Sequence, residues 1–94
     1  MAGYLVIAGE ISDPDAFGVY VDAVGPLLAR HGARRLLSGR GELLEGKVLK
    51  GLNVVFEFPS RTAVRAFWSD PAYAPVKALR ERCAEFNVLA FGEE

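Results

Sequence analysis

The stretch that decides the fold is Phe56–Cys83, which reads "FEFPSRTAVRAFWSDPAYAPVKALRERC". It opens with the end of an apolar strand, which Pro59 terminates because proline has no backbone N–H to offer a sheet. Ser60 follows as a residue suited to cap a helix, and the apolar spacing predicts that helix over Arg61–Trp68. Asp70-Pro71 repeats the combination of a capping residue and a proline, which predicts the start of a second helix. The stretch therefore predicts a strand followed by a bent pair of helices.

The segment before this stretch has the pattern of a strand followed by a helix. A buried strand is expected at Tyr4–Ile11, a mostly apolar run that ends in the turn sequence "SDPD". Asp13-Pro14 then marks the start of a helix, and Gly32 marks its end. Pro26 lies inside this predicted helix, where it removes one backbone hydrogen bond and is expected to bend the helix. The residues that recur at helical spacing on its apolar side are Phe17, Tyr20, Val24, Leu27 or Leu28, and His31.

Three further strands complete the predicted fold. The segment 33–40, "ARRLLSGR", is polar enough for an edge strand, and "GELLEG" at 41–46 is expected to form a turn. The apolar segment 48–58 predicts a strand that is central together with the first one, and "NVLAF" at 87–91 predicts a short last strand. The order strand, helix, strand, strand, helix, strand predicts an α+β fold. Its simplest form is ferredoxin-like, a four-stranded antiparallel sheet with two helices on one face.

Apolar side chains are expected on both faces of this sheet. Successive residues of a strand point to opposite faces, so Val54 and Phe56 face one way while Val55 faces the other. The first and last strands show the same pattern, with one set at Leu5, Ile7, Ile11, Phe86 and Val88 and the other at Tyr4, Val6, Ala8, Leu89 and Phe91. Two helices cover only one face, and a soluble monomer rarely leaves the other exposed to water. We therefore expect a homodimer that packs one open sheet face against another.

Composition limits the class of protein. The 94 residues fit one domain, 1–94, and a hydrophobic fraction of 51% with 24% charged residues is ordinary for a folded domain. The net charge of −1 gives no electrostatic reason to expect binding to nucleic acid or to a membrane surface. The chain has one cysteine, and its N-terminal apolar run is too short for a signal peptide or a membrane span. We therefore expect a cytoplasmic protein.

Several segments together resemble one protein family. They are "GYLVIAGEISDPDAFGVYV", "RHGARRLLSGRGELLEG", "VVFEFPSRTAVRAFWSDPAY" and "ALRERCAE", with the most specific motifs at Leu44–Gly46, Glu57–Ser60 and Phe67–Tyr73. From Gly3 to Gly92 the chain resembles the family named domain of unknown function 1330. The resemblance implies a dimeric α+β barrel, in which ferredoxin-like subunits pair through their sheets. It implies no catalytic residue, because no activity is assigned to the family. Similar folds include small monooxygenases, lactone isomerases, dehalogenating or dye-decolourising relatives and stress-response proteins, but a shared fold does not transfer a function.

Two sets of polar side chains are candidates for chemistry. His31 is the only histidine, and histidine is the default general base because it titrates near neutral pH. At the end of a helix it could equally interact with the helix dipole. Arg34 and Arg40 are expected on one face of the second strand, near Glu57 of the third. An arginine there could hold a substrate carboxylate while Glu57 moves a proton, or Glu57 could simply pair with an arginine across the strands.

Aromatic residues predict a pocket between the helices and the sheet. Tyr20, Trp68 and Tyr73 are candidate lining residues, together with Phe17 and Phe67. Ligand pockets are mostly apolar with a few polar groups, and two tyrosine hydroxyls could orient a bound compound. The same residues are also explained by plain core packing.

Metal and cofactor signals are weak in this sequence. Cys83 shares an apolar helical stripe with Val76, Leu79 and Phe86, where a buried structural thiol is expected. One His and one Cys match no metal-ligand spacing, and the G-x-G of "GRGELLEG" opens no helix that could bind a dinucleotide. No metal and no cofactor are therefore expected, with haem bound through His31 as a minor alternative.

Two hypotheses about function remain open from the sequence. The first is a small-molecule-binding or cofactor-independent enzyme subunit that acts on an apolar or aromatic compound, by oxygenation, isomerisation or hydrolysis. The second is a non-catalytic dimeric scaffold or stress-related ligand-binding module. Glu57 distinguishes them, because a carboxylate that is satisfied by an arginine favours the non-catalytic reading.

Overall fold

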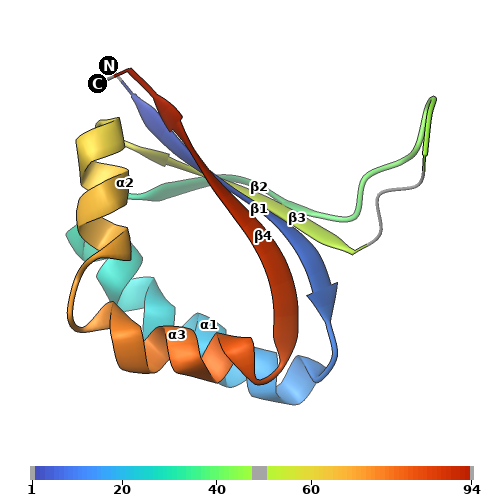
Figure 1. Cartoon of the computed structure of the whole chain (residues 1–94), viewed down its shortest axis with the longest axis horizontal. Coiled ribbons are helices and arrows are strands. Elements are labelled where there is room, and N and C mark those ends of the chain that lie inside the picture. The colour runs from blue at the N-terminus through green and yellow to red at the C-terminus, as the bar shows by residue number, and fades with distance from the viewer. Residues whose placement is uncertain (1, 48–50, 94) are drawn as a thin grey trace.

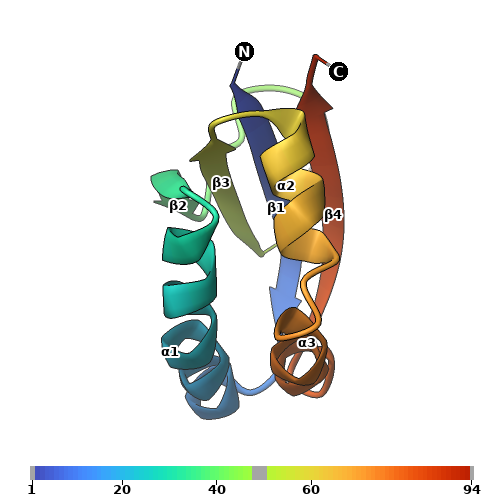
Figure 2. The same ribbon diagram turned by 90° about the vertical axis from the view of Figure 1, so that its left-hand side faces the viewer.

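In the part of the chain that the structure describes, four strands form one antiparallel sheet, and three helices pack on one of its faces (Figure 1). The computed structural model describes residues 2–47 and 51–93. In chain order the elements are β1 (Gly3–Ile11), α1 (Pro14–Arg30), β2 (Arg34–Gly39), β3 (Leu52–Phe58), α2 (Arg61–Trp68), α3 (Tyr73–Glu81) and β4 (Ala84–Gly92). Figure 2 shows α1 on one side and α2 and α3 on the other, all in front of the sheet. This is the predicted α+β, ferredoxin-like arrangement, with α2 and α3 together in the place of the second helix.

The strand order is β2-β3-β1-β4, so the apolar strands β1 and β3 are central and the polar β2 is an edge strand, as predicted. Val6 of β1 lies between Val55 of β3 and Leu89 of β4. Val55 in turn lies opposite Leu37 of β2. One row of apolar side chains therefore crosses all four strands on a single face.

Helix α1 begins and ends where its sequence signals predict. The side chain of Asp13 accepts a hydrogen bond from the backbone N–H of Ala16 at 3.2 Å, and Pro14 occupies the first helical position. His31 is the C-terminal capping residue, and Gly32 follows with φ +76°, a conformation that suits glycine. The chain can therefore turn sharply from α1 into β2.

The second helical region differs from its prediction at one point. Ser60 caps α2 as expected and accepts a hydrogen bond from the backbone N–H of Ala63 at 3.0 Å. The prediction that a helix begins at Asp70-Pro71 is wrong by two residues, because α3 begins at Tyr73 and has no side-chain cap. Asp70 instead accepts a hydrogen bond from the backbone N–H of Ala72 at 2.9 Å. It therefore stabilises the turn between the two helices rather than the helix start.

Strand boundaries also differ from the sequence-based ranges. β4 begins at Ala84 and is longer than predicted, so Phe86 belongs to this strand and not to the helical stripe of α3. β3 begins at Leu52, and residues 48–50 lie outside the described part of the chain. In β2 the register shifts between Arg35 and Leu37, as in a β-bulge. The predicted shared face of Arg34 and Arg40 is wrong for this reason: the bulge breaks the alternation, and Arg40 lies beyond the end of β2.

The core lies between the three helices and the sheet face that they cover. Its least exposed large side chains are Phe58, Phe67, Val64 and Cys83. Cys83 has the expected character of a buried structural thiol, because its Sγ lies 3.4 Å from the carbonyl oxygen of Leu79. The core therefore joins β3, α2 and the end of α3 into one packed unit.

Candidate functional site

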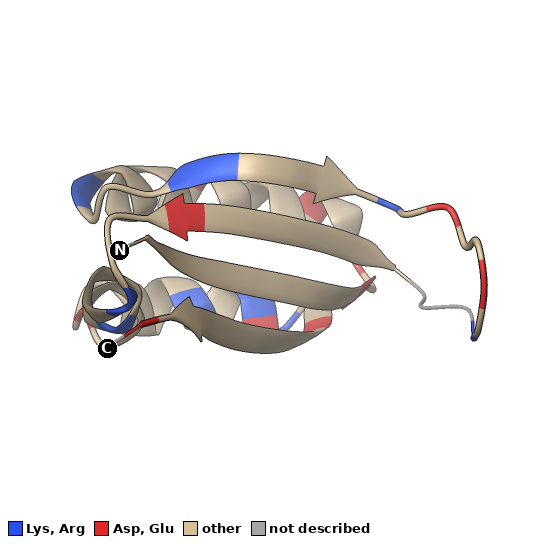
Figure 3. Cartoon of the chain, turned by 90° about the horizontal axis from the view of Figure 1, so that it is seen from above, with Lys and Arg blue, Asp and Glu red and all other residues tan. Residues whose placement is uncertain are grey.

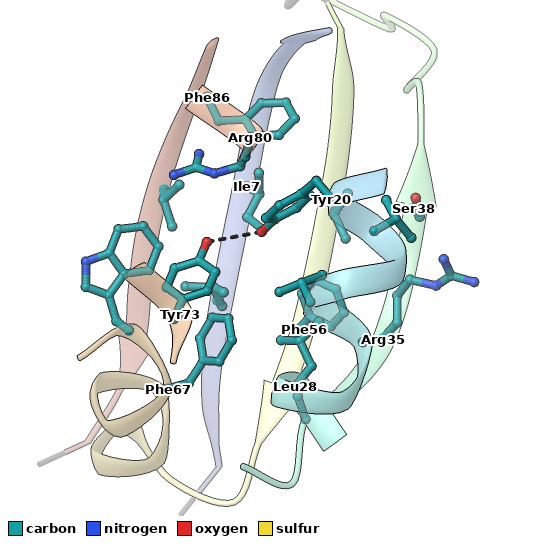
Figure 4. Close-up of a pocket in the computed structure, with 18 of the residues that line it drawn as sticks. Ile7, Tyr20, Leu28, Arg35, Ser38, Phe56, Phe67, Tyr73, Arg80 and Phe86 are labelled. Carbon is teal, nitrogen blue, oxygen red and sulfur yellow. Dashed lines mark hydrogen bonds between the residues drawn. The ribbon is translucent and has the colours of Figure 1, made fainter. Parts of the chain in front are cut away.

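A cavity of about 340 Å³ lies between the sheet and the helices (Figure 4). Its walls come from α1, α2, α3 and the covered face of all four strands. Most lining side chains are apolar or aromatic, among them Ile7, Phe17, Leu28, Phe56, Phe67, Trp68 and Phe86. Polar groups are few and come from Tyr20, Tyr73, Arg80, Arg35 and Ser38. An apolar cavity with a few convergent polar groups is the usual form of a small-molecule site.

Two tyrosine hydroxyls meet inside this cavity. Tyr20 of α1 and Tyr73 of α3 are 7% and 2% exposed, and their hydroxyl oxygens form a hydrogen bond of 3.1 Å (Figure 4). Burial raises the pKa of the Tyr20 hydroxyl well above its usual value, and the hydrogen bond with Tyr73 raises it further. Tyr20 is therefore a neutral phenol, which can donate a proton in a hydrogen bond but does not act as a base near neutral pH.

Arg80 is a cavity residue that the sequence did not single out. It is 7% exposed, and its guanidinium lies over the rings of Phe86 and Trp68 at 5.7 and 5.9 Å from their centroids. The available signal was its position seven residues after Tyr73, which places both on one face of a helix. That signal is ambiguous, because an arginine at the last turn of a helix is ordinarily solvent-exposed.

His31 forms a pair with Asp70 outside the cavity lining. Its Nε2 lies 2.8 Å from Oδ2 of Asp70, and Arg30 lies 3.4 Å from the same oxygen. The ring of His31 also packs edge-on against Phe67, which is a lining residue. The pair ties the end of α1 to the turn between α2 and α3. Because His31 is not among the residues that line the cavity, the structure does not favour it as an axial haem ligand.

The Asp70 pair gives a pH-dependent prediction. The hydrogen bond from His31 lowers the pKa of the Asp70 carboxyl below its usual value of 3.8, and the backbone N–H of Ala72 lowers it further. A carboxyl group whose pKa is lower in the folded state stabilises the fold at pH values above its unfolded-state pKa. This stabilisation is lost as the pH falls through the folded-state pKa. We expect Asp70→Asn to lower the melting temperature at about pH 5, and the difference from wild type to shrink as the pH falls below about 4.

Thermal unfolding followed by circular dichroism between pH 7 and pH 3 measures this difference. Asp22→Asn, at an exposed position of α1, is the matched control and should follow the wild type throughout. A difference between Asp70→Asn and wild type that grows as the pH falls below about 4 would contradict the assignment.

Arg34 and Glu57 lie on the opposite face of the sheet from the cavity. Their side chains form an ion pair of 2.8 Å across β2 and β3, with the Arg34 side chain 71% exposed. Arg40 is exposed beyond the end of β2 and does not line the cavity. The structure therefore brings Tyr20, Trp68 and Tyr73 together in the cavity and places His31, Arg34, Arg40 and Glu57 elsewhere.

The open face of the sheet carries the apolar row Leu37, Val55, Val6 and Leu89. Leu37 is 53% exposed and Leu89 57%, and nearby Phe91 is 49% exposed. Figure 3 views the sheet with the helices behind it, and charged residues colour only short stretches of the strands. The pair of Arg34 and Glu57 lies on this face. An apolar surface of this kind on a sheet is typical of an interface.

Within residues 2–47 and 51–93, no three His, Cys, Asp or Glu side chains are grouped closely enough to hold a metal ion. In the same part of the chain, no helix has the length and apolar character needed to cross a membrane.

The sequence of this chain matches one known protein family. A family model described as a domain of unknown function (DUF1330) matches residues 2–93. The chain belongs to this family. The resemblance found in the sequence motifs is therefore confirmed over nearly the whole chain. Among curated proteins, no sequence matches the chain.

Solved structures that resemble this DUF1330 chain support the fold. The protein RPA0582 from Rhodopseudomonas palustris, described as of unknown function, aligns with a TM-score of 0.77 and 18% identity over 99% of this chain and 82% of its own. A dimeric ferredoxin-like protein of unknown function from Thermobifida fusca aligns with a TM-score of 0.65 and 16% identity over 99% and 92%. A dimeric protein of ferredoxin-like fold from Bacteroides fragilis aligns with a TM-score of 0.65 and 12% identity over 98% and 96%. The predicted ferredoxin-like fold is confirmed, and two of these neighbours are described as dimers.

Proposed function

We propose that this DUF1330 chain is one subunit of a homodimer whose cavity binds an apolar or aromatic small molecule. The observation that carries the proposal is the cavity itself, with apolar walls and a buried pair of tyrosine hydroxyls. Its volume of about 340 Å³ lies within the range of ordinary ligand sites. The groups that approach it are hydrogen-bond donors and aromatic rings, which bind and orient a compound.

The dimer is proposed to form through the open face of the sheet. The row Leu37, Val55, Val6 and Leu89 offers apolar side chains on all four strands, and the three helices cover only the opposite face. Two solved neighbours that cover almost this whole chain are described as dimeric. A second copy of this chain is therefore the occupant that we propose for this face. We further propose that the protein is cytoplasmic and has no nucleic-acid or membrane partner, on the basis of its composition.

A catalytic role is the second candidate, and one observation favours it. The His31–Asp70 pair, at 2.8 Å, has the form in which a carboxylate orients an imidazole that acts as a general base. Glu57 is less suited to proton transfer, because Arg34 holds its carboxylate on the far side of the sheet. The cavity lining holds tyrosines and arginines but neither His31 nor Glu57, so binding is the better-supported function.

Indole, a neutral aromatic probe, tests the proposed cavity site. Addition of indole to ¹⁵N-labelled protein should shift the amide signals around Ile7, Phe56 and Phe67. In the variant Ile7→Trp the new side chain should fill the cavity, so those shifts should largely disappear because the space is taken.

Val19→Trp is the matched control, because Val19 is 59% exposed on α1 and does not line the cavity. It should bind indole as the wild type does. Shifts confined to surface residues, or shifts that persist in Ile7→Trp, would contradict the proposal. Native mass spectrometry of the protein purified from cells reports the dimer and any retained compound in the same measurement.

A further inference from the structure

Arg80 presents an unpaired buried charge to the cavity. Among residues 2–47 and 51–93 it is the only charged residue that is buried, at 7% exposure. Within the same ranges no carboxylate forms an ion pair with it, and its buried Nε has no hydrogen-bond acceptor. The charge is carried by a planar guanidinium, which has five N–H donors and no acceptor.

Two aromatic rings lie next to the guanidinium of Arg80. Phe86 and Trp68 lie at 5.7 and 5.9 Å from the guanidinium carbon, and both rings also line the cavity. Aromatic faces attract a cation, but they do not accept the directed hydrogen bonds that a guanidinium donates. Burial of an ion without a counter-charge is unfavourable in free energy, because the ion loses its hydration. A buried guanidinium without such a partner is therefore suited to bind an anion.

The tyrosine pair adds a second donor close to this cation. Two hydroxyls carry two protons, and the hydrogen bond between Tyr20 and Tyr73 uses only one of them. The other proton remains available to a third group in the cavity. The charge of Arg80 lowers the pKa of the Tyr20 hydroxyl, against the larger effect of burial. Figure 4 shows Arg80 and the tyrosine pair in the same part of the cavity.

We propose that the ligand is an aromatic or apolar monocarboxylic acid whose carboxylate binds to Arg80 and to the free proton of the Tyr20–Tyr73 pair. The inference rests on the proposed function and specifies the ligand class of the same cavity. A carboxylate accepts hydrogen bonds without donating any, which complements the guanidinium of Arg80 and the remaining tyrosine proton. The guanidinium fork can hold both carboxylate oxygens. The ring or alkyl part then fills the apolar space near Phe17, Phe56 and Phe67.

The charge of the site favours a monoanion over a phosphate. Arg80 supplies one buried positive charge, and the remaining walls are mainly apolar. A phosphate group near neutral pH brings more than one negative charge, and the excess would lie against apolar walls without a partner. Arg35 also lines the cavity, but it is an exposed residue of β2 and stays in contact with water.

A matched pair of ligands tests the proposal, namely 3-phenylpropionate and its neutral amide 3-phenylpropanamide. Isothermal titration at pH 7 should give the wild type a dissociation constant at least about tenfold lower for the carboxylate, because hydrogen bonds to charged groups are the stronger ones. Arg80→Gln should abolish this preference while the amide still binds. Arg40→Gln, which removes an exposed arginine that does not line the cavity, is the matched control and should keep the preference.

A separate measurement excludes a purely structural role for Arg80. Arg80→Met replaces the unpaired cation by an apolar side chain of similar length, so the melting temperature without ligand should rise or stay unchanged. Added 3-phenylpropionate should then raise that temperature in the wild type but not in the variant. A lower melting temperature combined with an unchanged ligand effect would give Arg80 a packing role and overturn the proposal.

The outcomes also separate this proposal from the one on which it rests. Equal binding of the acid and the amide, in wild type and in Arg80→Gln, would overturn the carboxylate assignment and leave the cavity as a binding site. The carboxylate assignment would also be overturned if the protein bound indole but did not bind 3-phenylpropionate. Absence of binding by indole and by both phenyl compounds would overturn the cavity function itself.

Discussion

Leu89→Asp should convert the protein from a dimer to a monomer. Leu89 is 57% exposed at one end of the apolar row Leu37, Val55, Val6 and Leu89, on the face that no helix covers. In the proposed dimer each copy buries this side chain against its partner, so the substitution places two unpaired carboxylates in an apolar interface. An unpaired buried charge destabilises by several kcal/mol, and each 1.4 kcal/mol is a factor of ten in an equilibrium constant. We expect the dissociation constant to increase at least about 1,000-fold.

Light scattering coupled to size exclusion, over a series of micromolar concentrations, measures this change. Val19→Asp is the control, because Val19 is 59% exposed but lies on α1, which packs on the covered face of the sheet. It should remain a dimer. A wild type that is monomeric at these concentrations, or a Leu89→Asp variant that stays dimeric, would contradict the proposed interface.

The fold was largely predictable because its signals are local and consistent. Proline and capping residues at Asp13-Pro14 and Ser60 mark helix starts, and alternation in β1 and β3 assigns their side chains to the correct faces. The errors lie where local signals compete. Asp70-Pro71 has the composition of a helix start, but the same carboxylate is used by His31 and by the turn, so the helix begins at Tyr73.

The register of β2 could not be read from its sequence. A β-bulge depends on how a strand matches its neighbour, and nothing in "ARRLLSGR" shows which residue is unpaired. The bulge sends Arg35 and Ser38 to the cavity side and keeps Arg34 with Glu57 on the open face. An interpretation based on strict alternation therefore grouped Arg34 with Arg40, which the structure separates.

The candidate site was predictable where aromatic residues recur at helical spacing. Tyr20, Trp68 and Tyr73 line the cavity as expected, because helices place residues of one stripe against the sheet. Arg80 was missed because charge ordinarily indicates exposure, whereas its guanidinium lies beside the rings of Phe86 and Trp68. A tertiary contact between α3 and β4 is not visible in a single sequence.

Phe67→Ala should remove a large part of the stability of this fold. Phe67 is 1% exposed, and its ring packs against Phe58 of β3 at 5.7 Å, Tyr73 of α3 at 4.6 Å and His31 at the end of α1 at 5.9 Å. Phenylalanine-to-alanine changes in cores lower the free energy of unfolding by about 3–5 kcal/mol, because burial is lost and a cavity remains. For a domain of this size that corresponds to a fall in melting temperature of about 15 °C or more.

Phe67→Leu separates the loss of packing from the loss of the ring contacts. Leucine retains most of the buried apolar volume, so it should lower the free energy of unfolding by only about 1.5 kcal/mol. Urea unfolding at one fixed protein concentration measures both variants, since the stability of a dimer depends on concentration. Phe67 connects one strand and the ends of all three helices, and through Tyr73 it supports the hydroxyl that reaches Tyr20. If Phe67→Ala were as stable as Phe67→Leu, packing by the ring of Phe67 would not be what holds these elements together. Other residues would then have to keep the cavity in shape.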